Sequence, residues 1–458
     1  MPRILTVVAV ALMLALAAPA TASTAAGTWT PPVDIASGAS TGSAPRIITD
    51  PHGILVATWS GQLAGAPVIY AATSHDDGAT WISPFVVSGA IVPTGYPNIT
   101  VTDTGLVVII WATGGNEVVA TRSTDGGDTW STPTFVDVDP NSMSEPRVAA
   151  GDSRVIAVWH RYQGSDNWVM ASYSDDGITW SVPTAISLVG ANAYEPQIDM
   201  SGTSATVVWF DYPGSGVVIR SATTVDNALS WTPSAPLSSA GSSTYAPRIA
   251  RAADGTLTVA WTATTSLRTA TSTDGGATWT PQLELSPAVG VSQFRVAAGT
   301  VAWMEGGSAF VSTTTNHGAT WSSPLQVSAA GATVSEIDIA NTNTGEITVV
   351  ARYSAGAGNF VGESTSQDGG ATWSTMANLS ATPLPVGVDL AVSPQRGALV
   401  VWGGASIQFT ARLAAAAAGP TTPTGLANGG VEPLPWAVAG LLIVAIGAGA
   451  RLRRRERV

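Results

Sequence analysis

The chain has 458 residues, only 11% of them charged, with 48 Gly, 17 Trp and no Cys. This composition is typical of many short strands joined by turns, and it excludes disulfide scaffolds and thiolate metal sites. Between residues 23 and 433 there are 13 Arg against 30 acidic residues, which argues against nucleic acid as a partner because a negative surface repels phosphates. The four His residues are scattered, so we expect neither a metal site nor another cofactor.

Residues 1–22 carry an early Arg3, an apolar run and an Ala20-Thr-Ala22 sequence. This order predicts a secretory signal peptide that is removed from the mature protein. A retained membrane anchor is the alternative, although the apolar run is short for a span.

One stretch, Ser272-Thr-Asp-Gly-Gly-Ala-Thr-Trp279, occurs seven times in variant forms. Its polar residue recurs at Asp76, Asp125, Asp175, Asp226, Asp274, Asn316 and Asp368, and its last residue at Trp81, Trp130, Trp180, Trp231, Trp279, Trp321 and Trp373. These tryptophans lie 42 to 52 residues apart. Regular spacing of this size indicates a repeat architecture.

The residue types of this stretch favour a tight turn between two strands. The Asp side chain accepts hydrogen bonds from turn N–H groups, and Gly supplies a backbone angle that other residues resist. The Trp then fills space between neighbouring units. The pattern resembles the Asp box, or BNR repeat, of sialidases and related β-propellers. In that family the box is structural and lies on the face opposite the active site, so the resemblance is specific for the fold and is much weaker evidence for an activity.

Each repeat predicts four short strands, which is one propeller blade. First strands are expected near Pro45, Pro97, Pro146, Pro196, Pro247, Phe294, Ile337 and Val388. The last repeat lacks an Asp box and a fourth strand, and the missing pieces are found at Trp29 and at residues 32–35. We therefore predict an all-β propeller over residues 27–413 whose N-terminal strand closes a ring of eight blades and hides both sheet edges. Seven blades or a distorted ring are the alternatives.

After the repeats, residues 414–433 form an Ala-, Gly-, Pro- and Thr-rich linker. Residues 434–450 are apolar and precede an Arg-rich tail at 451–458, which predicts a transmembrane helix with a cytoplasmic tail. Residues 426–430 resemble the cell-wall sorting signal of Gram-positive bacteria, but Gly429 stands where that signal has Thr. Wall attachment and plain membrane anchoring both remain open, and both place the propeller outside the cell.

Aligning the first strands puts one polar residue of every blade in the same register. These residues are Arg46, Asn98, Arg147, Gln197, Arg248, Arg295, Asp338 and Asp389. Four Arg in such a ring could bind a carboxylate, since a guanidinium matches that group with two hydrogen bonds. Pairing of these Arg with neighbouring acids or carbonyls is the alternative.

Sialidases bind the carboxylate of sialic acid with three Arg, the first in an Arg-Ile-Pro motif, and the segment around Pro45-Arg46-Ile47 resembles that region with the Pro moved. The family also uses a Tyr nucleophile paired with a Glu. The resemblance implies Tyr353 and Glu305 as candidates for this pair, on corresponding loops of adjacent blades, although surface solvation explains both residues equally well.

These observations predict an envelope-anchored binding module for a glycan, peptide or envelope component, with one propeller rim as its binding face. An exo-α-sialidase or a related glycosidase is the alternative, and a purely structural spacer is a third. We expect a monomer, although no motif tests the oligomeric state.

Overall fold

A computed structural model describes residues 27–36, 42–214, 216–239, 244–264, 266–286, 290–342, 345–356, 358–380, 385–393, 397–404 and 406–412. The predicted signal peptide, linker, transmembrane helix and tail lie outside these residues. In the part that is described, no helix has the length and apolar character needed to cross a membrane.

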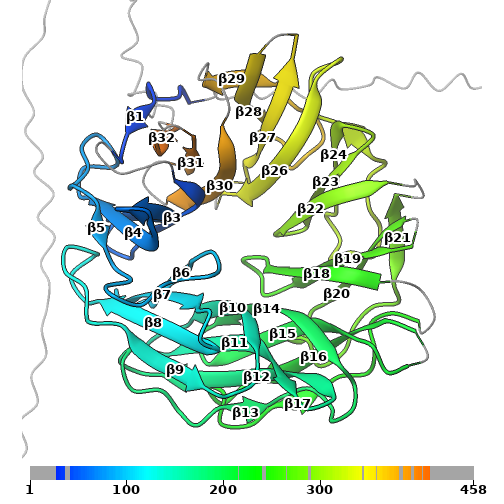
Figure 1. Cartoon of the computed structure of the whole chain (residues 1–458). Coiled ribbons are helices and arrows are strands. Elements are labelled where there is room, and N and C mark those ends of the chain that lie inside the picture. Colours follow the sequence, from blue (N-terminus) through cyan, green and yellow to red (C-terminus); the bar gives the residue numbers. More distant parts are fainter. Residues whose placement is uncertain are drawn as a thin grey trace, which may run out of the picture. The chain divides into compact units, whose positions relative to one another are not determined.

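The described strands form eight antiparallel sheets of four strands each, arranged as blades around a central axis (Figure 1). The first strands, nearest the axis, are β2 (Ser43–Thr49), β6 (Asn98–Val101), β10 (Met143–Ala150), β14 (Ala193–Ser201), β18 (Thr244–Arg251), β22 (Val291–Ala297), β26 (Thr333–Asn341) and β30 (Val386–Ser393). The second strands are β3 (Leu55–Leu63), β7 (Val107–Ala112), β11 (Val155–Gln163), β15 (Ser204–Asp211), β19 (Leu257–Ala263), β23 (Thr300–Glu305), β27 (Ile347–Ala355) and β31 (Gly397–Gly403).

In every blade but the second, the fourth strand is the shortest of the four. The third strands are β4 (Ala66–Ser74), β8 (Glu117–Ser123), β12 (Asp166–Ser174), β16 (Val218–Thr224), β20 (Ser266–Ser272), β24 (Ser308–Thr313), β28 (Gly358–Ser366) and β32 (Gln408–Ala411). The fourth strands are β5 (Phe85–Val86), β9 (Thr134–Val138), β13 (Thr184–Ala185), β17 (Thr232–Pro233), β21 (Leu283–Ser286), β25 (Leu325–Gln326), β29 (Ala377–Ser380) and, in the last blade, β1 (Val33–Asp34).

The N-terminal strand closes the ring, as predicted. Val33 pairs with Phe409, and the backbone N–H of Ile35 donates to the carbonyl of Ile407 at 2.9 Å. Trp29 forms a bridge with Arg412 and packs against the core of the last blade. Both edges of the circle are therefore paired, and the prediction of eight blades is confirmed.

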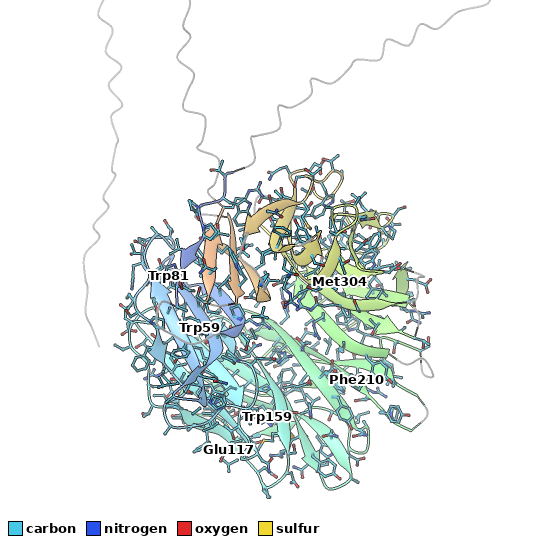
Figure 2. All side chains as sticks on the ribbon, turned by 45° about the horizontal axis from the view of Figure 1, so that its top comes forward. Trp59, Trp81, Glu117, Trp159, Phe210 and Met304 are labelled. Atoms are coloured by element: carbon cyan, nitrogen blue, oxygen red, sulfur yellow. The ribbon has the colours of Figure 1, made fainter. Side chains whose placement is uncertain are left out.

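The core lies between adjacent blades and is dominated by tryptophans of the second strands. The buried set is Trp59, Trp111, Trp159, Trp209, Trp261, Trp303 and Trp402, with Trp59 and Trp159 labelled in Figure 2. Replacing a buried Trp by Ala usually costs about 3–5 kcal/mol. These residues therefore explain why a sequence with few charges and many turns holds one rigid architecture.

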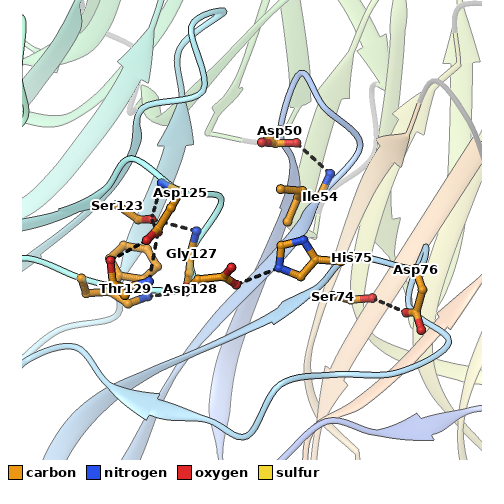
Figure 3. A network of polar contacts seen from close by, with 11 residues as sticks. Asp50, Ile54, Ser74, His75, Asp76, Ser123, Asp125, Gly127, Asp128 and Thr129 are labelled. Carbon is orange, nitrogen blue, oxygen red and sulfur yellow. Dashed lines mark hydrogen bonds and ion pairs between the residues drawn. The ribbon is translucent and has the colours of Figure 1, made fainter.

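The Asp boxes form the turns between third and fourth strands. In the second blade, Asp125 accepts hydrogen bonds from the hydroxyl of Ser123 (2.7 Å) and from the N–H of Thr129 (3.0 Å), as Figure 3 shows. The N–H of Gly127 donates to Ser123, and the indole of Trp130 donates to the Gly127 carbonyl. The equivalent acceptors are Asp76, Asp226, Asp274, Asn316 and Asp368.

The third blade corrects one predicted residue. Asp176, and not Asp175, accepts the hydrogen bonds from the hydroxyl of Ser174 (3.0 Å) and the N–H of Thr179 (2.7 Å). Asp175 instead forms a bidentate ion pair with Arg154 at 2.5 and 2.8 Å. The reason is that this box is one residue shorter, so the acceptor is found by counting two positions forward from the Ser.

The Trp of each box is partly buried against a core cluster between blades. This holds for Trp81, Trp130, Trp180, Trp231, Trp279, Trp321 and Trp373. In the first blade Trp81 meets Phe409 of the last blade edge-on, with ring centroids 5.1 Å apart. Each box thus fastens one blade to the blade before it.

Candidate functional site

Seven of the eight first strands shift register against the second strand, and four of them have a Pro at the shift. The residue before the Pro has a positive φ in each, at Ala44 (48°), Glu145 (56°), Glu195 (49°) and Ala246 (54°). The strand register shifts across each of these positions. Pro has no N–H to donate to the ladder, so a bulge is the natural way to accommodate it inside a sheet.

Beyond the bulges, the first strands line an axial cavity of about 250 Å³. Its lining comprises Arg46, Asn98, Arg147, Val148, Gln197, Ile198, Arg248, Arg295, Asp338 and Asp389. All eight polar residues that the sequence alignment placed in one register therefore meet here. Four guanidinium groups and two carboxylates face one small volume.

On one side of the cavity the Arg residues have acidic partners. Arg46 forms an ion pair with Asp389 at 3.1 Å, and Arg295 lies 3.6 Å from Asp338. The N–H of Ile47 and the N–H of Leu390 also donate to these two carboxylates. Burial nevertheless raises the pKa of Asp389, with Arg46 opposing the rise. This side is a built network in which charge is largely compensated.

On the other side, Arg147 and Arg248 donate to the carbonyls of the residues that precede them, Pro146 at 3.1 Å and Pro247 at 2.9 Å. Burial lowers the pKa of the Arg147 guanidinium. Burial, together with the charges of Arg295 and Arg147, lowers the pKa of Arg248 to about 10. Both groups stay protonated at neutral pH, so this side holds positive charge that lacks a direct carboxylate contact.

Two further carboxylates, Glu145 and Glu195, stand on the bulges of the third and fourth blades, two residues before the cavity residues Arg147 and Gln197. The contact with His160 is the main cause that lowers the pKa of Glu145, whereas burial and the nearby Glu145 raise the pKa of Glu195. Both glutamates act electrostatically on Arg147 and Arg248. The bulge that directs these two glutamates is invisible in a one-dimensional sequence pattern.

Tyr353 and Glu305 are held by different partners. The Tyr353 hydroxyl donates to Asn378 on an outer strand, and burial raises its pKa. Glu305 accepts hydrogen bonds from Ser286 (2.7 Å) and from the indole of Trp303 (3.0 Å). The catalytic pairing of these two residues stays a prediction, and neither of them lines the axial cavity.

In the part of the chain that the structure describes, no three His, Cys, Asp or Glu side chains are grouped so that they could hold a metal ion. The chemistry available at the axis is therefore that of guanidinium, carboxylate and amide groups.

Comparison with solved structures places the chain among propellers that include glycan-active proteins. An ulvan lyase bound to a GlcA(1-4)Rha3S saccharide has a TM-score of 0.51 at 12% identity, with 82% of this chain and 94% of that chain covered. An α-L-arabinanase of Penicillium chrysogenum has a TM-score of 0.44 at 14% identity, covering 84% and 98%. The NanB sialidase of Streptococcus pneumoniae has a TM-score of 0.41 at 11% identity, covering 83% and 70%.

The comparison with curated protein sequences gave no match. The structural likenesses, all at low identity, concern the fold. A family model described as BNR repeat-like domain matches residues 21–209 and 213–402, which is most of the chain. The protein therefore belongs to the BNR repeat-like family of sialidase-like β-propellers.

Proposed function

We propose that this propeller binds a glycan carrying a carboxylate, with the acidic group held in the axial cavity by Arg147 and Arg248. The observation that carries the proposal is the unequal charge of the cavity: all four Arg donate to the carbonyl of the preceding residue, but only Arg46 and Arg295 also contact a carboxylate. A buried guanidinium without a carboxylate is costly, and a bidentate carboxylate ligand would offset that cost.

The size of the cavity supports a terminal sugar as the ligand. Pockets for drug-sized ligands usually measure about 300–1,000 Å³, and this one is about 250 Å³. One acidic sugar therefore fits, with the remainder of the glycan outside the mouth. The ulvan lyase with the similar fold was solved with a saccharide that contains GlcA, which is a carboxylate sugar.

The test is binding calorimetry on the full chain with sialosides and uronate oligosaccharides, each beside its carboxyl-reduced form. Arg147→Met and Arg248→Met should weaken binding about 10- to 100-fold, the loss expected when a charge-assisted hydrogen bond is removed. The matched control is Arg268→Met, because Arg268 is half-buried outside the cavity and pairs with Glu284 at 3.6 Å. Equal affinity for native and carboxyl-reduced glycans would end the proposal.

The same variants should not lose stability. Burial lowers the pKa of Arg248, so its charged form is less favourable in the folded protein than in the unfolded chain. This cost is present at neutral pH and is relieved only above about pH 10. Arg248→Met is therefore expected to leave the melting temperature unchanged or higher while binding is lost, which separates a functional role from a structural one.

Cleavage by an exo-α-sialidase mechanism is the second candidate, favoured by the gathering of four Arg in one cavity. It requires the release of a fluorophore from an aryl sialoside and the loss of this activity in Tyr353→Phe and Glu305→Gln. If no turnover occurs between pH 4 and pH 8, the protein is a binding module only.

We also infer that the propeller is exported and tethered to the cell envelope through residues 434–450, with 1–22 removed. The support is the order of apolar and Arg-rich segments at the two ends of the chain. Mass spectrometry of the mature N-terminus and membrane fractionation test this. An intact Met1 or recovery of the protein in the soluble cytoplasmic fraction would contradict it.

A further inference from the structure

The third blade holds a Ser, a His and a Glu in the order of a proton relay, just before the cavity residue Arg147 of the same strand. Ser144 on β10 lies directly opposite His160 on β11 in the strand register. The Oγ atom of Ser144 is 2.9 Å from Nε2 of His160, and the Nδ1 atom of the same ring lies 3.6 Å from Oε2 of Glu145. We call Ser144, His160 and Glu145 the relay cluster.

Two buried polar atoms of this cluster face one another without any other partner. Neither Nδ1 of His160 nor Oε2 of Glu145 makes a hydrogen bond in the structure. The His160 side chain is only 15% exposed, and the ring of Tyr194 packs edge-on against it with centroids 5.6 Å apart. A small contraction would turn the 3.6 Å contact into a hydrogen bond, and such contacts commonly tighten when substrate binds.

The equivalent positions of other blades show that the blade architecture does not require this cluster. In the first blade Ser43 lies opposite Ser60, and Ala44 occupies the bulge. In the fifth blade Tyr245 lies opposite Thr262, and Ala246 occupies the bulge. The third blade alone among these three combines a hydroxyl, an imidazole and a carboxylate, whereas all three share the positive φ of the bulge residue. Buried polar atoms without a partner, such as Nδ1 of His160, call for an explanation beyond the fold.

We propose that the relay cluster hydrolyses acyl esters, with Ser144 as the nucleophile, His160 as the general base and Glu145 as the positioning residue. In the first step the Ser144 oxygen forms a bond to the ester carbonyl carbon, and its proton moves to Nε2 of His160. The tetrahedral intermediate collapses as the bond to the alcohol oxygen breaks, and the alcohol leaves with that proton. Water, deprotonated by His160, then attacks the acyl-serine and releases the carboxylic acid and free Ser144.

The surroundings of the cluster indicate the class of ester. Arg147 and Arg248 act electrostatically on Glu145, so the same positive charge can stabilise the oxyanion of the intermediate. The identity of the ester rests on the proposed function. If these Arg hold a sugar carboxylate, the substrate is an O-acyl ester carried by an acidic sugar. The acid product of the ester and the deacylated sugar would both leave through the mouth.

The first experiment tests the nucleophile and needs no glycan. Incubating the full chain with a fluorophosphonate should form a phosphorus–oxygen bond at Ser144 with loss of fluoride, which peptide mass spectrometry locates. Ser144→Ala should abolish the labelling. Ser43→Ala is the matched control, because Ser43 has the same place in a blade that lacks the His and the Glu, and it should label like the wild type.

The second experiment measures turnover of an aryl acetate. Ser144→Ala and His160→Gln should lower kcat by on the order of 10²- to 10⁴-fold, the usual contribution of acid–base catalysis. Glu145→Gln should lower kcat with KM and melting temperature unchanged, a split that a merely structural role would not produce. Labelling at other sites only, or equal turnover of Ser144→Ala and Ser43→Ala, would overturn the proposal.

A third measurement separates this proposal from the proposed function. Arg248→Met should lose the preference for acetyl esters of acidic over neutral sugars, and its fluorophosphonate labelling should slow because the same charge stabilises the oxyanion. Labelling of Ser144 with no such preference in the wild type supports the esterase and refutes carboxylate binding. Acidic glycan binding without labelling of Ser144 supports the binding function and refutes the esterase.

Discussion

The two ends of the blades differ in how faithfully they repeat. At the Asp-box end, seven turns reproduce the same hydrogen bonds. In each turn an Asp, or Asn316, accepts one from the hydroxyl of a Ser or Thr two residues before it. It accepts another from a backbone N–H three or four residues after it. At the cavity end, the register residue changes from Arg to Asn, Gln or Asp around the ring. Repetition therefore marks a turn that seven blades share for their fold, and variation on a constant backbone marks the end where we propose that the ligand binds.

The largest loss of stability is expected at Gly78 in the first Asp box, where it tests whether the repeated end of the blades is needed for folding. Its φ is 84°, and a Cβ atom there would lie 2.0 Å from the ring of Phe409. Gly78→Ala should lower the free energy of unfolding by roughly 2–5 kcal/mol, from the left-handed backbone and the overpacking together. Chemical denaturation measures it.

Gly65→Ala is the matched control, since Gly65 has a φ of 85° and no atom within 4 Å of the added Cβ. It should cost only about 1–2 kcal/mol, the backbone contribution alone. Equal losses of unfolding free energy in the two variants would mean that the packing of Gly78 against Phe409 contributes nothing to stability. Ligand affinity per folded molecule should be the same in both.

A smaller effect tests the corrected assignment in the third blade. Asp176→Ala removes the acceptor of the turn and should cost about 1–2 kcal/mol. Asp175→Ala removes an ion pair in which the Asp is 61% exposed, and such pairs contribute below about 1 kcal/mol. Thermal melts of both variants check the order. If Asp175→Ala were the more destabilising change, the acceptor would be the residue five positions before the Trp and not the residue two positions after the Ser.

The smallest effect concerns pH. The hydrogen bonds from Thr372 lower the pKa of Asp368 from 3.8 to about 2. Because the pKa of this carboxyl is lower in the folded protein than in the unfolded chain, the ionised Asp368 stabilises the fold fully above pH 3.8. This stabilisation is lost as the pH falls through 2. Asp368→Asn should therefore weaken the pH dependence of the melting temperature between about pH 4 and pH 2.

Asn316 shows that an Asn can serve in this position, because it makes the equivalent contacts to Thr314 and Thr320. The melting temperature of Asp368→Asn at neutral pH should consequently fall only slightly. If the melting temperature of this variant depends on pH as strongly as that of the wild type, other carboxylates cause the loss of stability in acid.

The sequence predicted the ring well because the signals were periodic. The spacing of the box tryptophans gave the blade length, and the incomplete last repeat matched the extra pieces at Trp29 and residues 32–35. The register of Arg46, Arg147, Arg248 and Arg295 followed from the same alignment, since equivalent residues of equivalent strands point in equivalent directions. Each of these inferences needed only a comparison of the chain with itself.

The remaining features depend on local geometry that periodicity does not encode. Glu145 reaches His160 only because a bulge before Pro146 turns its backbone to a positive φ, and Ser144 meets the same His160 only through the cross-strand pairing. Tyr353 and Glu305 were predicted to lie in loops, but the structure places them in β27 and β23, where Tyr353 is opposite Val334 and Glu305 is opposite Ser308. Pairings across strands thus require coordinates, whereas positions along strands do not.

Ring closure also has a consequence for how the molecule is made. Thr30 and Thr410 are hydrogen-bonded although they are 380 positions apart in the chain. A growing polypeptide can assemble one blade after another, but the circle is completed only when the final strand has emerged and found the partner that was synthesised first. Until then two sheet edges stay open to pairing with other chains, so the nascent protein is most exposed to aggregation just before its synthesis ends.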